Sequence, residues 1–285
     1  MVTLKSLKQK IEADLKNDGI EEASLDARLL ISHIVPITEI DFAINGDMDI
    51  TDDQYDAILK LVQKRLNRIP MSQIFGEKEF WSLNFKVTKD TLTPRPDSET
   101  LIEVALKKIE DKERPLSILH LGTGSGCLLL SLLSEFKSAV GVGVDISDEA
   151  LKVACENSEK LLLNDRATFI QSNWFDGVSD KDKFDIIIAN PPYIGLNEQS
   201  ELAPEVIDHE PHTALFSGEK GLDDYNKIAS EIPKFITKDG IIILEIGYQQ
   251  ARLVRDIFKR ARFEKITIFQ DLGGRDRCLL IEQHG

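Results

Sequence analysis

The sequence predicts an α/β protein with a mostly parallel sheet, an antiparallel hairpin at its C-terminal end, and a small all-helical domain in front. Apolar residues recur at helical spacing in the first part of the chain, up to about residue 70. From about residue 98, short apolar runs alternate with helical stretches, which is typical of a parallel sheet covered on both faces. We therefore predict a helical domain over 1–70, a β-hairpin linker over 71–97 and an α/β domain over 98–285.

End signals support three helices in the first domain. Gly19 follows the first apolar stripe as a C-cap, and Ser24 is placed to cap the second helix, which Pro36 ends. Thr51 and Gln54 form a capping-box pattern before the third helix. The apolar positions of the three stripes are Leu4, Leu7, Ile11, Leu15, then Leu25, Leu29, Leu30, Ile34, then Tyr55, Ile58, Leu61, Val62, Leu66.

The linker and the α/β domain are predicted from strand-like runs. EFWSLNFKV (79–87) alternates apolar and polar residues, which predicts a strand or a short hairpin. Helical stretches separate the first five of the later runs, whereas LGGRDR joins the last two and predicts an antiparallel pair. The seven later runs are 116–121, 140–145, 167–172, 184–189, 240–246, 265–271 and 278–283.

Composition and charge argue against a nucleic-acid-binding, a membrane-spanning or a secreted protein. The formal net charge is −14, which disfavours a long nucleic acid as the main partner, because such proteins neutralise phosphates with Lys and Arg. No run approaches 18 apolar residues, and the N-terminus lacks the apolar core of a signal peptide. We therefore expect a cytoplasmic protein without a membrane partner, and a monomer by default.

Cysteine and histidine usage gives no sign of a metal site or a disulfide framework. Cys127, Cys155 and Cys278 are far apart and odd in number, so we expect them to be buried thiols. The histidines other than His120 have no metal-ligand spacing and are expected to be surface or structural residues; they are His33, His209, His212 and His284.

A glycine-rich segment, LHLGTGSGCLLL, lies between a predicted strand and a predicted helix. Gly122, Gly124 and Gly126 would let the backbone turn sharply and approach a ligand at the helix N-terminus. The third glycine comes one residue earlier than in the dinucleotide pattern, a spacing more familiar from S-adenosylmethionine sites. The alternative is a tight structural turn that binds nothing.

Asp145 ends the next predicted strand, in VGVGVDIS. A carboxylate at this place can accept hydrogen bonds from both ribose hydroxyls of a nucleoside. The alternative is that Asp145 caps the following helix, but Ser147 already fits that role. The glycines and Asp145 together indicate a cofactor that contains adenosine.

The stretch FDIIIANPPYIG (184–195) ends a strand on Asn190 and then restricts the backbone with Pro191 and Pro192. The Asn190 side-chain carbonyl and the Pro191 main-chain carbonyl would accept both hydrogens of one NH₂ group. Such contacts oppose delocalisation of the nitrogen lone pair and stabilise the charge that develops during attack. Tyr193 could pack on the flat substrate group. The alternative is a rigid junction between strand and loop.

With these motifs, the chain resembles the HemK-type release factor glutamine methyltransferases, and the resemblance spans nearly its whole length. The stretches that carry it are LDARLL, GEKEFWSL (76–83), TLTPRPDSE (91–99), LGTGSG, QSNWF (171–175), NPPYI and HEPHTALFSGEKGL (209–222). It implies a Rossmann-like fold that uses S-adenosylmethionine. It also implies methyl transfer to the side-chain amide N5 of the glutamine in the Gly-Gly-Gln loop of peptide-chain release factors, which modulates translation termination.

The resemblance also implies roles for individual residues. The loop formed by Gly122, Thr123, Gly124, Ser125 and Gly126 would hold the cofactor together with Asp145, while Trp174 would flank its adenine. Asn190 would lie between cofactor and substrate, and Asn190, Pro191, Pro192 and Tyr193 would bind the glutamine. Arg95 and Glu210 match family motifs, but they receive no firm role and could equally make a structural loop contact. The glutamine amide would attack the methyl group in line, without a strong base.

One departure and two rival functions stay open. The family usually has an acid two residues before the first motif glycine, where this chain has His120. If that acid helps to hold the methionine end of the cofactor, affinity could differ here, or His120 could make the contact through a ring N–H. A DNA or RNA amino-methyltransferase is the first rival, disfavoured by the acidic charge. The second is a non-catalytic protein of the same fold that binds the release factor without methylating it.

Overall fold

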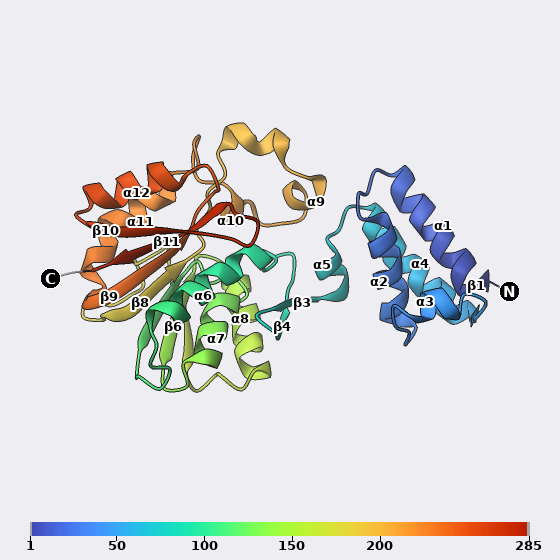
Figure 1. The fold of residues 1–285 in the computed structure, drawn as a ribbon, viewed down its shortest axis with the longest axis horizontal. Helices are drawn as coiled ribbons and strands as arrows, with labels where there is room; N and C mark the ends of the chain where they lie inside the picture. Colours follow the sequence, from blue (N-terminus) through green and yellow to red (C-terminus); the bar gives the residue numbers. More distant parts are fainter. Residues whose placement is uncertain (1, 284–285) are drawn as a thin grey trace. The chain divides into compact units, whose positions relative to one another are not determined.

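The computed structural model describes residues 2–283 and divides into two compact units (Figure 1). The first unit runs from the N-terminus to Gly76 and includes a later segment, Pro204–His209. The second unit contains Glu77–Ala203 and the chain from Glu210 onward. Among residues 2–283, no helix is both long and apolar enough to cross a bilayer.

The first unit is a small helical bundle with its own apolar core. Its helices are α1 (Leu4–Asn17), α2 (Ala23–Ile34), α3 (Asp41–Ile44), α4 (Asp52–Leu66), α5 (Met71–Phe75) and, from the later segment, α9 (Pro204–Ile207). Two short strands, β1 (Val2–Thr3) and β2 (Asp49–Ile50), pair antiparallel. The core includes Leu7, Ile11, Leu30, Ile58 and Val62, which confirms the predicted stripes of α1 and α4.

The helix ends confirm two predictions and correct a third. After α1, Gly19 has a φ of 75°, and the Ile20 N–H bonds to the Leu15 carbonyl, which together form a Schellman cap. Thr51 and Gln54 form the predicted capping box of α4. The prediction that Ser24 caps α2 is wrong, because α2 already begins at Ala23 and its N-cap residue makes no side-chain cap bond.

The buried face of α2 also differs from the prediction. Leu25 and Leu29 are each 38% exposed, whereas Asp26 lies inside the unit. The Asp26 carboxylate accepts a hydrogen bond from Arg65 Nε at 2.7 Å, and Arg65 also pairs with Glu205 at 3.0 Å. Because this buried ion pair requires Asp26 to face inward, the helix turns Leu25 and Leu29 outward.

The second unit contains a seven-stranded sheet with the order β10-β11-β9-β8-β5-β6-β7. Strands β5 to β9 are parallel, and β11 pairs antiparallel with both β9 and β10, which confirms the predicted hairpin. The bounds are β5 (Ser117–Leu121), β6 (Val140–Asp145), β7 (Ala167–Gln171), β8 (Phe184–Ala189), β9 (Ile236–Glu245), β10 (Lys265–Gln270) and β11 (Asp276–Glu282).

Apolar side chains cover both faces of this sheet. On β8, Ile186 and Ile188 belong to one apolar cluster, and Ile187 and Ala189 belong to the other, as expected for a strand buried on both sides. Helices α6 (Glu99–Lys108) and α7 (Cys127–Glu135) contribute to the first cluster, and α11 (Asp223–Glu231) and α12 (Ala251–Arg260) to the second. Helix α8 (Asp148–Lys160) contacts β6 and β7, and the shorter helical segments are η1 (Pro96–Ser98), η2 (Leu196–Glu201), α10 (His212–Leu215) and η3 (Ile232–Lys234).

One connection contradicts the prediction of a helix between each of the first five strands. Residues 172–183, between β7 and β8, contain turns and no helix. The Ser172 hydroxyl accepts the Gly177 N–H and donates to the Trp174 carbonyl, which closes a tight loop. Phe175 and Val178 are buried in the apolar core. The loop therefore buries its apolar residues without forming a helix.

A two-stranded hairpin precedes the sheet in the chain. Its strands are β3 (Glu77–Phe80) and β4 (Leu83–Lys86), and Phe80 and Phe85 pack into a core cluster of the second unit. The turn residues Trp81 and Ser82 have φ values of 53° and 56°, in the left-handed region where non-glycine residues are rare. Hydrogen bonds from the Trp81 main chain to Glu99 and from its indole to Glu135 hold this conformation.

The strand order brings the predicted site residues to one edge of the sheet. Strand β5 pairs with β6 on one side and with β8 on the other, and Leu121 faces both Val144 and Ala189 in the register. The residues that follow these strand ends therefore lie together. In open α/β sheets, a ligand binds at such a point, where the strand order reverses.

Candidate active site

A pocket of about 530 Å³ opens at this edge of the second unit. Its lining comes from the segment around Thr91–Ser98, from the loops after β5, β6 and β7, from the start of the loop after β8, and from the residues around Pro211–Phe216. The size suits a small-molecule ligand. The predicted residues that line it are Gly122, Thr123, Gly124, Ser125, Asp145, Trp174, Asn190 and Pro192; Gly126, Pro191 and Tyr193 do not.

The glycine loop needs its glycines for two different reasons. Gly122, Gly124 and Gly126 have φ values of 66°, 53° and 81°, in the left-handed region that favours glycine. A Cβ added at Gly124 would meet no atom within 4 Å, so that side of the backbone is open. A Cβ at Gly126 would lie 3.1 Å from Leu130 and 3.3 Å from Ala154, which shows that Gly126 serves the packing of α7 against α8.

Asp145 stiffens the same loop. One carboxylate oxygen accepts the Gly124 N–H at 2.8 Å, and the other accepts the Ser147 N–H at 2.9 Å. Ser147 caps α8 through its side chain, as predicted. Each oxygen keeps a second lone pair for a ligand hydroxyl. Burial raises the pKa of Asp145, against the opposing effect of these main-chain donors.

His120 is a buried, neutral side chain at the base of the pocket. Burial lowers its pKa to about 3, and its Nδ1 lies 2.8 Å from the Thr123 hydroxyl. If Thr123 donates this hydrogen bond, its buried hydroxyl hydrogen has an acceptor and the ring proton lies on Nε2. Nε2 is buried and has no hydrogen-bond partner within residues 2–283. In this tautomer, His120 offers a neutral N–H donor in a lining that also contains Gly122 and Asp145.

Trp174 forms part of the wall beside the glycine loop. Its backbone has a φ of 57°, and its indole Nε1 donates to Asp224 Oδ1 at 3.0 Å. A Cβ added at Gly122 would lie 3.6 Å from its ring. The hydrogen bond to Asp224 fixes the ring, so the flat indole offers a surface for another flat group.

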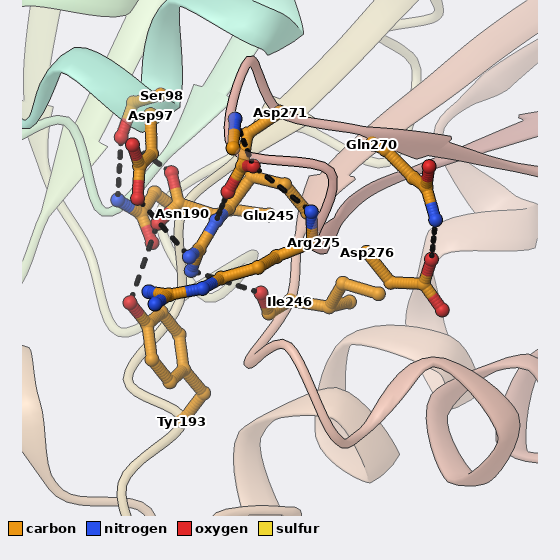
Figure 2. Close-up of polar contacts among 12 residues, drawn as sticks. Asp97, Ser98, Asn190, Tyr193, Glu245, Ile246, Gln270, Asp271, Arg275 and Asp276 are labelled. Atoms are coloured by element: carbon orange, nitrogen blue, oxygen red, sulfur yellow. Dashed lines mark hydrogen bonds and ion pairs between the residues drawn. The ribbon is translucent and has the colours of Figure 1, made fainter.

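The loop after β8 puts Asn190 into the pocket and turns Tyr193 away from it. The Asn190 side chain lines the pocket, and its Nδ2 donates to the Ser98 hydroxyl at 3.4 Å. The Tyr193 hydroxyl donates to Glu245 Oε1 at 3.4 Å, and its main-chain carbonyl accepts from Gln250 at 2.8 Å. Figure 2 shows the Asn190 side chain beside Ser98 and the Tyr193 hydroxyl directed toward Glu245.

Sequence reasoning missed Ser98 and Glu245. Both are buried, and the Ser98 hydroxyl donates to Glu245 Oε2. The available signals were an acid at the end of an otherwise apolar strand in GIIILEIG, and an unassigned serine in TLTPRPDSE. The structure also pairs Arg95, which lines the pocket, with the buried Glu210 at 2.5 Å. Burial raises the pKa of Glu210, and Arg95 opposes that effect.

Among residues 2–283, the cysteines and histidines do not form a common site. Cys278 is buried as expected, Cys127 is half-buried, and Cys155 is exposed on α8, contrary to the prediction. In the described part of the chain, no three residues among His, Cys, Asp and Glu are grouped so as to hold a metal ion. His33 stacks on Phe75, and His209 contacts the Asn67 carbonyl. His284 lies outside the described residues.

Two family models match the chain. A methyltransferase domain model matches residues 112–277. A second model, described as the PrmC N-terminal domain, matches residues 6–76.

Curated relatives match over almost the whole chain. The release factor glutamine methyltransferase of Caulobacter vibrioides is 37% identical, over 93% of this chain and 91% of the relative. A bifunctional methyltransferase of Rickettsia felis is 36% identical over 98% of this chain, which spans 58% of that longer protein.

A solved structure shares the fold. The N-terminal domain of human METTL16 in complex with SAH is 16% identical, with a TM-score of 0.53, and the match covers 90% of this chain and 94% of that one.

Proposed function

The chain belongs to the family of release factor glutamine methyltransferases, and from this premise we propose that it methylates the side-chain amide nitrogen of the Gly-Gly-Gln glutamine in peptide-chain release factors. The observation that carries the proposal is the position of Asn190, at the end of β8 and in the lining of the same pocket as Gly124 and Asp145. This arrangement brings an amide-binding group to the place where a nucleoside would bind.

The pocket residues fit S-adenosylmethionine as the methyl donor. Asp145 has free lone pairs for ribose hydroxyls, and Trp174 offers a fixed flat surface for adenine. His120 Nε2, buried and without a partner in the described chain, fits an acceptor such as the carboxylate of the methionine end. When bound, S-adenosylmethionine supplies a methyl group on a sulfonium, which is electrophilic without help from a base.

The protein's own contribution is to hold the amide. The Asn190 carbonyl would accept one N–H of the glutamine side chain. Pro191 does not line the pocket, so a contact of its main-chain carbonyl with the second N–H stays a prediction. Such fixed acceptors stabilise positive charge on nitrogen as it develops. Tyr193 does not line the pocket, so we propose that it acts from behind the loop, through Glu245, and not by packing on the glutamine.

Mass spectrometry of a purified bacterial release factor, incubated with the protein and S-adenosylmethionine, tests the function. We expect a gain of one methylene group on the Gly-Gly-Gln glutamine, located by fragmentation of the peptide. Cofactor binding without this gain would contradict the proposed substrate, and an RNA or DNA substrate would then be tested. Failure to bind the cofactor would favour the non-catalytic alternative.

We also propose that the first unit docks the release factor. Ile40, which precedes α3, and Ile44, its last residue, are 67% and 71% exposed, so two large apolar side chains lie open among the described residues of this unit. Changing both to serine should raise KM for the whole release factor and leave KM for a free Gly-Gly-Gln peptide unchanged. An equal effect on both substrates would contradict the docking role.

A further inference from the structure

A chain of hydrogen bonds runs from the buried Glu245 carboxylate through Ser98 to Asn190, which lines the pocket (Figure 2). Glu245 ends β9 and is 1% exposed; Ser98 ends η1 and is 3% exposed. The Ser98 hydroxyl donates to Glu245, and Asn190 Nδ2 donates to the Ser98 oxygen at 3.4 Å. Ser98 and Asn190 line the pocket, while Glu245 lies behind them.

The direction of these bonds determines which end of the Asn190 amide faces the substrate. An ionised carboxylate can only accept hydrogen bonds, so Ser98 must donate its single hydrogen to Glu245. The Ser98 oxygen can then only accept, and only the NH₂ end of Asn190 can bind to it. The Asn190 carbonyl is left for the substrate.

We propose that Ser98 and Glu245 are positioning residues for methyl transfer, which lock the Asn190 amide with its carbonyl toward the substrate nitrogen. The inference rests on the proposed function, since it needs an amine or amide substrate at Asn190. The separation of 3.4 Å between Asn190 Nδ2 and Ser98 Oγ is at the long end for a hydrogen bond. A carbonyl in that place would accept the substrate N–H, whereas an NH₂ group would repel it.

The second carboxylate oxygen of Glu245 makes a further contact that holds the side chain in place. Oε1 accepts the Tyr193 hydroxyl at 3.4 Å, which ties the carboxylate to the loop that carries Asn190. The titratable groups that face Glu245 are Asp97 on η1, Cys127 on α7, Tyr193 after β8, Tyr225 on α11, and Arg277 and Cys278 on β11.

Glu245 is therefore the group in this cluster that we expect to respond to pH near neutrality. Its burial raises its pKa to about 7, while Ser98 and Arg277 oppose that effect. Burial raises the pKa of Cys127 to about 11, and it also raises the pKa values of Tyr193 and Tyr225. When Glu245 takes up a proton it can donate to Ser98, and the fixed direction of the bonds is lost.

The test compares Ser98→Ala, Ser98→Thr and Glu245→Gln with the wild-type protein, using initial rates on a purified release factor and calorimetry with S-adenosylmethionine. We expect Ser98→Ala to lower kcat about tenfold, the scale of one lost hydrogen bond, with unchanged cofactor Kd. Ser98→Thr keeps the hydroxyl and should restore kcat. Matched controls are Ser131→Ala, a buried serine of α7, and Glu282→Gln, a buried acid of β11.

The pH profile separates positioning from a merely structural role. Wild-type kcat should fall on the acid side of about pH 7, and Glu245→Gln should be slower and lack this acid limb. An active wild-type protein whose Ser98→Ala variant keeps full kcat would overturn the inference while leaving the proposed function intact. So would a Glu245→Gln variant that keeps the acid limb, or a Ser98→Ala variant whose loss comes with unfolding or lost cofactor binding. An inactive wild-type protein would instead contradict the proposed function.

Discussion

The two ends of the pocket hold their shape in different ways. At the glycine loop, left-handed backbone at Gly122 and Gly124 and main-chain donors to Asp145 define the surface. At the loop after β8, Asn190 depends on side chains from distant parts of the chain, Ser98 and Glu245. Local backbone geometry thus forms the proposed cofactor end, and long-range side-chain contacts form the proposed reaction end. Substitutions should separate the two, changing affinity at the first and turnover at the second.

The largest expected effect lies at the reaction end. Asn190→Ala removes an acceptor for the substrate amide and should lower kcat by about 10²- to 10³-fold, as removal of one preorganised catalytic group does elsewhere. Calorimetry should show cofactor affinity close to that of the wild type. Asn164→Ala, at an exposed asparagine, is the matched control. A variant that turns over normally would remove the basis for distinguishing the two ends.

A smaller effect is expected at the cofactor end. Asp145→Asn removes a charge and one acceptor position while keeping the side-chain shape. S-adenosylmethionine should bind about 10- to 100-fold more weakly, the scale of hydrogen bonds to a charged group. At saturating cofactor, kcat should match the wild type. Asp148→Asn, at an exposed acid in the first turn of α8, controls for the change of net charge. A fall in kcat with unchanged Kd would reverse the roles assigned to the two ends.

Alanine substitutions at two glycines of the loop should lower the free energy of unfolding by different amounts. Gly124→Ala should lower the free energy of unfolding by about 1–2 kcal/mol, because a Cβ in left-handed backbone is strained. Gly126→Ala should lower it by more, since its Cβ would also press on Leu130 and Ala154. Urea unfolding followed by circular dichroism measures both. Equal losses would mean that packing at Gly126 relaxes without cost.

The smallest expected effect is the pH dependence of cofactor affinity. Because burial lowers the pKa of His120 to about 3, the ring stays neutral through mildly acidic pH. The cofactor Kd should then show no His120 titration between about pH 5 and pH 7, a range in which an ordinary histidine changes charge. A calorimetric pH series tests this, and His120→Gln is the comparison. A titration that disappears in His120→Gln would show that the ring is not neutral.

His120 should also make the free energy of unfolding depend on pH. The unfolded chain protonates His120 near its ordinary pKa of 6.5, and the folded chain does so only near 3. Acidification through this window therefore favours unfolding. Glu245 acts in the opposite direction, since its raised folded pKa costs stability as pH rises through about 7. His120→Gln should remove the first slope, and Glu245→Gln the second.

The backbone part of the site could be predicted from the sequence because it is local. Glycines at fixed spacing, an acid ending a strand and a proline-restricted asparagine are each contained within a few residues. The parallel sheet and its final hairpin followed from the same kind of local pattern. The apolar periodicity gave the wrong buried face for α2, because the buried contact of Asp26 with Arg65 turns Asp26 inward. It also predicted a helix in 172–183, where hydrogen bonds of the Ser172 side chain form a loop.

The side-chain part of the site could not be predicted because its partners are far apart in the sequence. Ser98 and Glu245 are separated by 147 positions, and no local pattern indicates that they meet. The hairpin turn at Trp81 shows the same limit. No glycine or asparagine marks it, because distant Glu99 and Glu135 hold its left-handed backbone.

The segment Pro204–His209 bears on how this gene can recombine. It belongs to the first unit, where Glu205 pairs with Arg65 and the His209 carbonyl accepts from Gln73. A DNA fragment that ends at codon 76 therefore does not encode a complete helical unit. Grafted onto another methyltransferase, it would leave Arg65 paired with Asp26 alone and without Glu205. The coding sequence of the first unit is thus in two pieces, and the second piece lies within the coding sequence of the second unit. A functional exchange of the first unit has to carry both pieces.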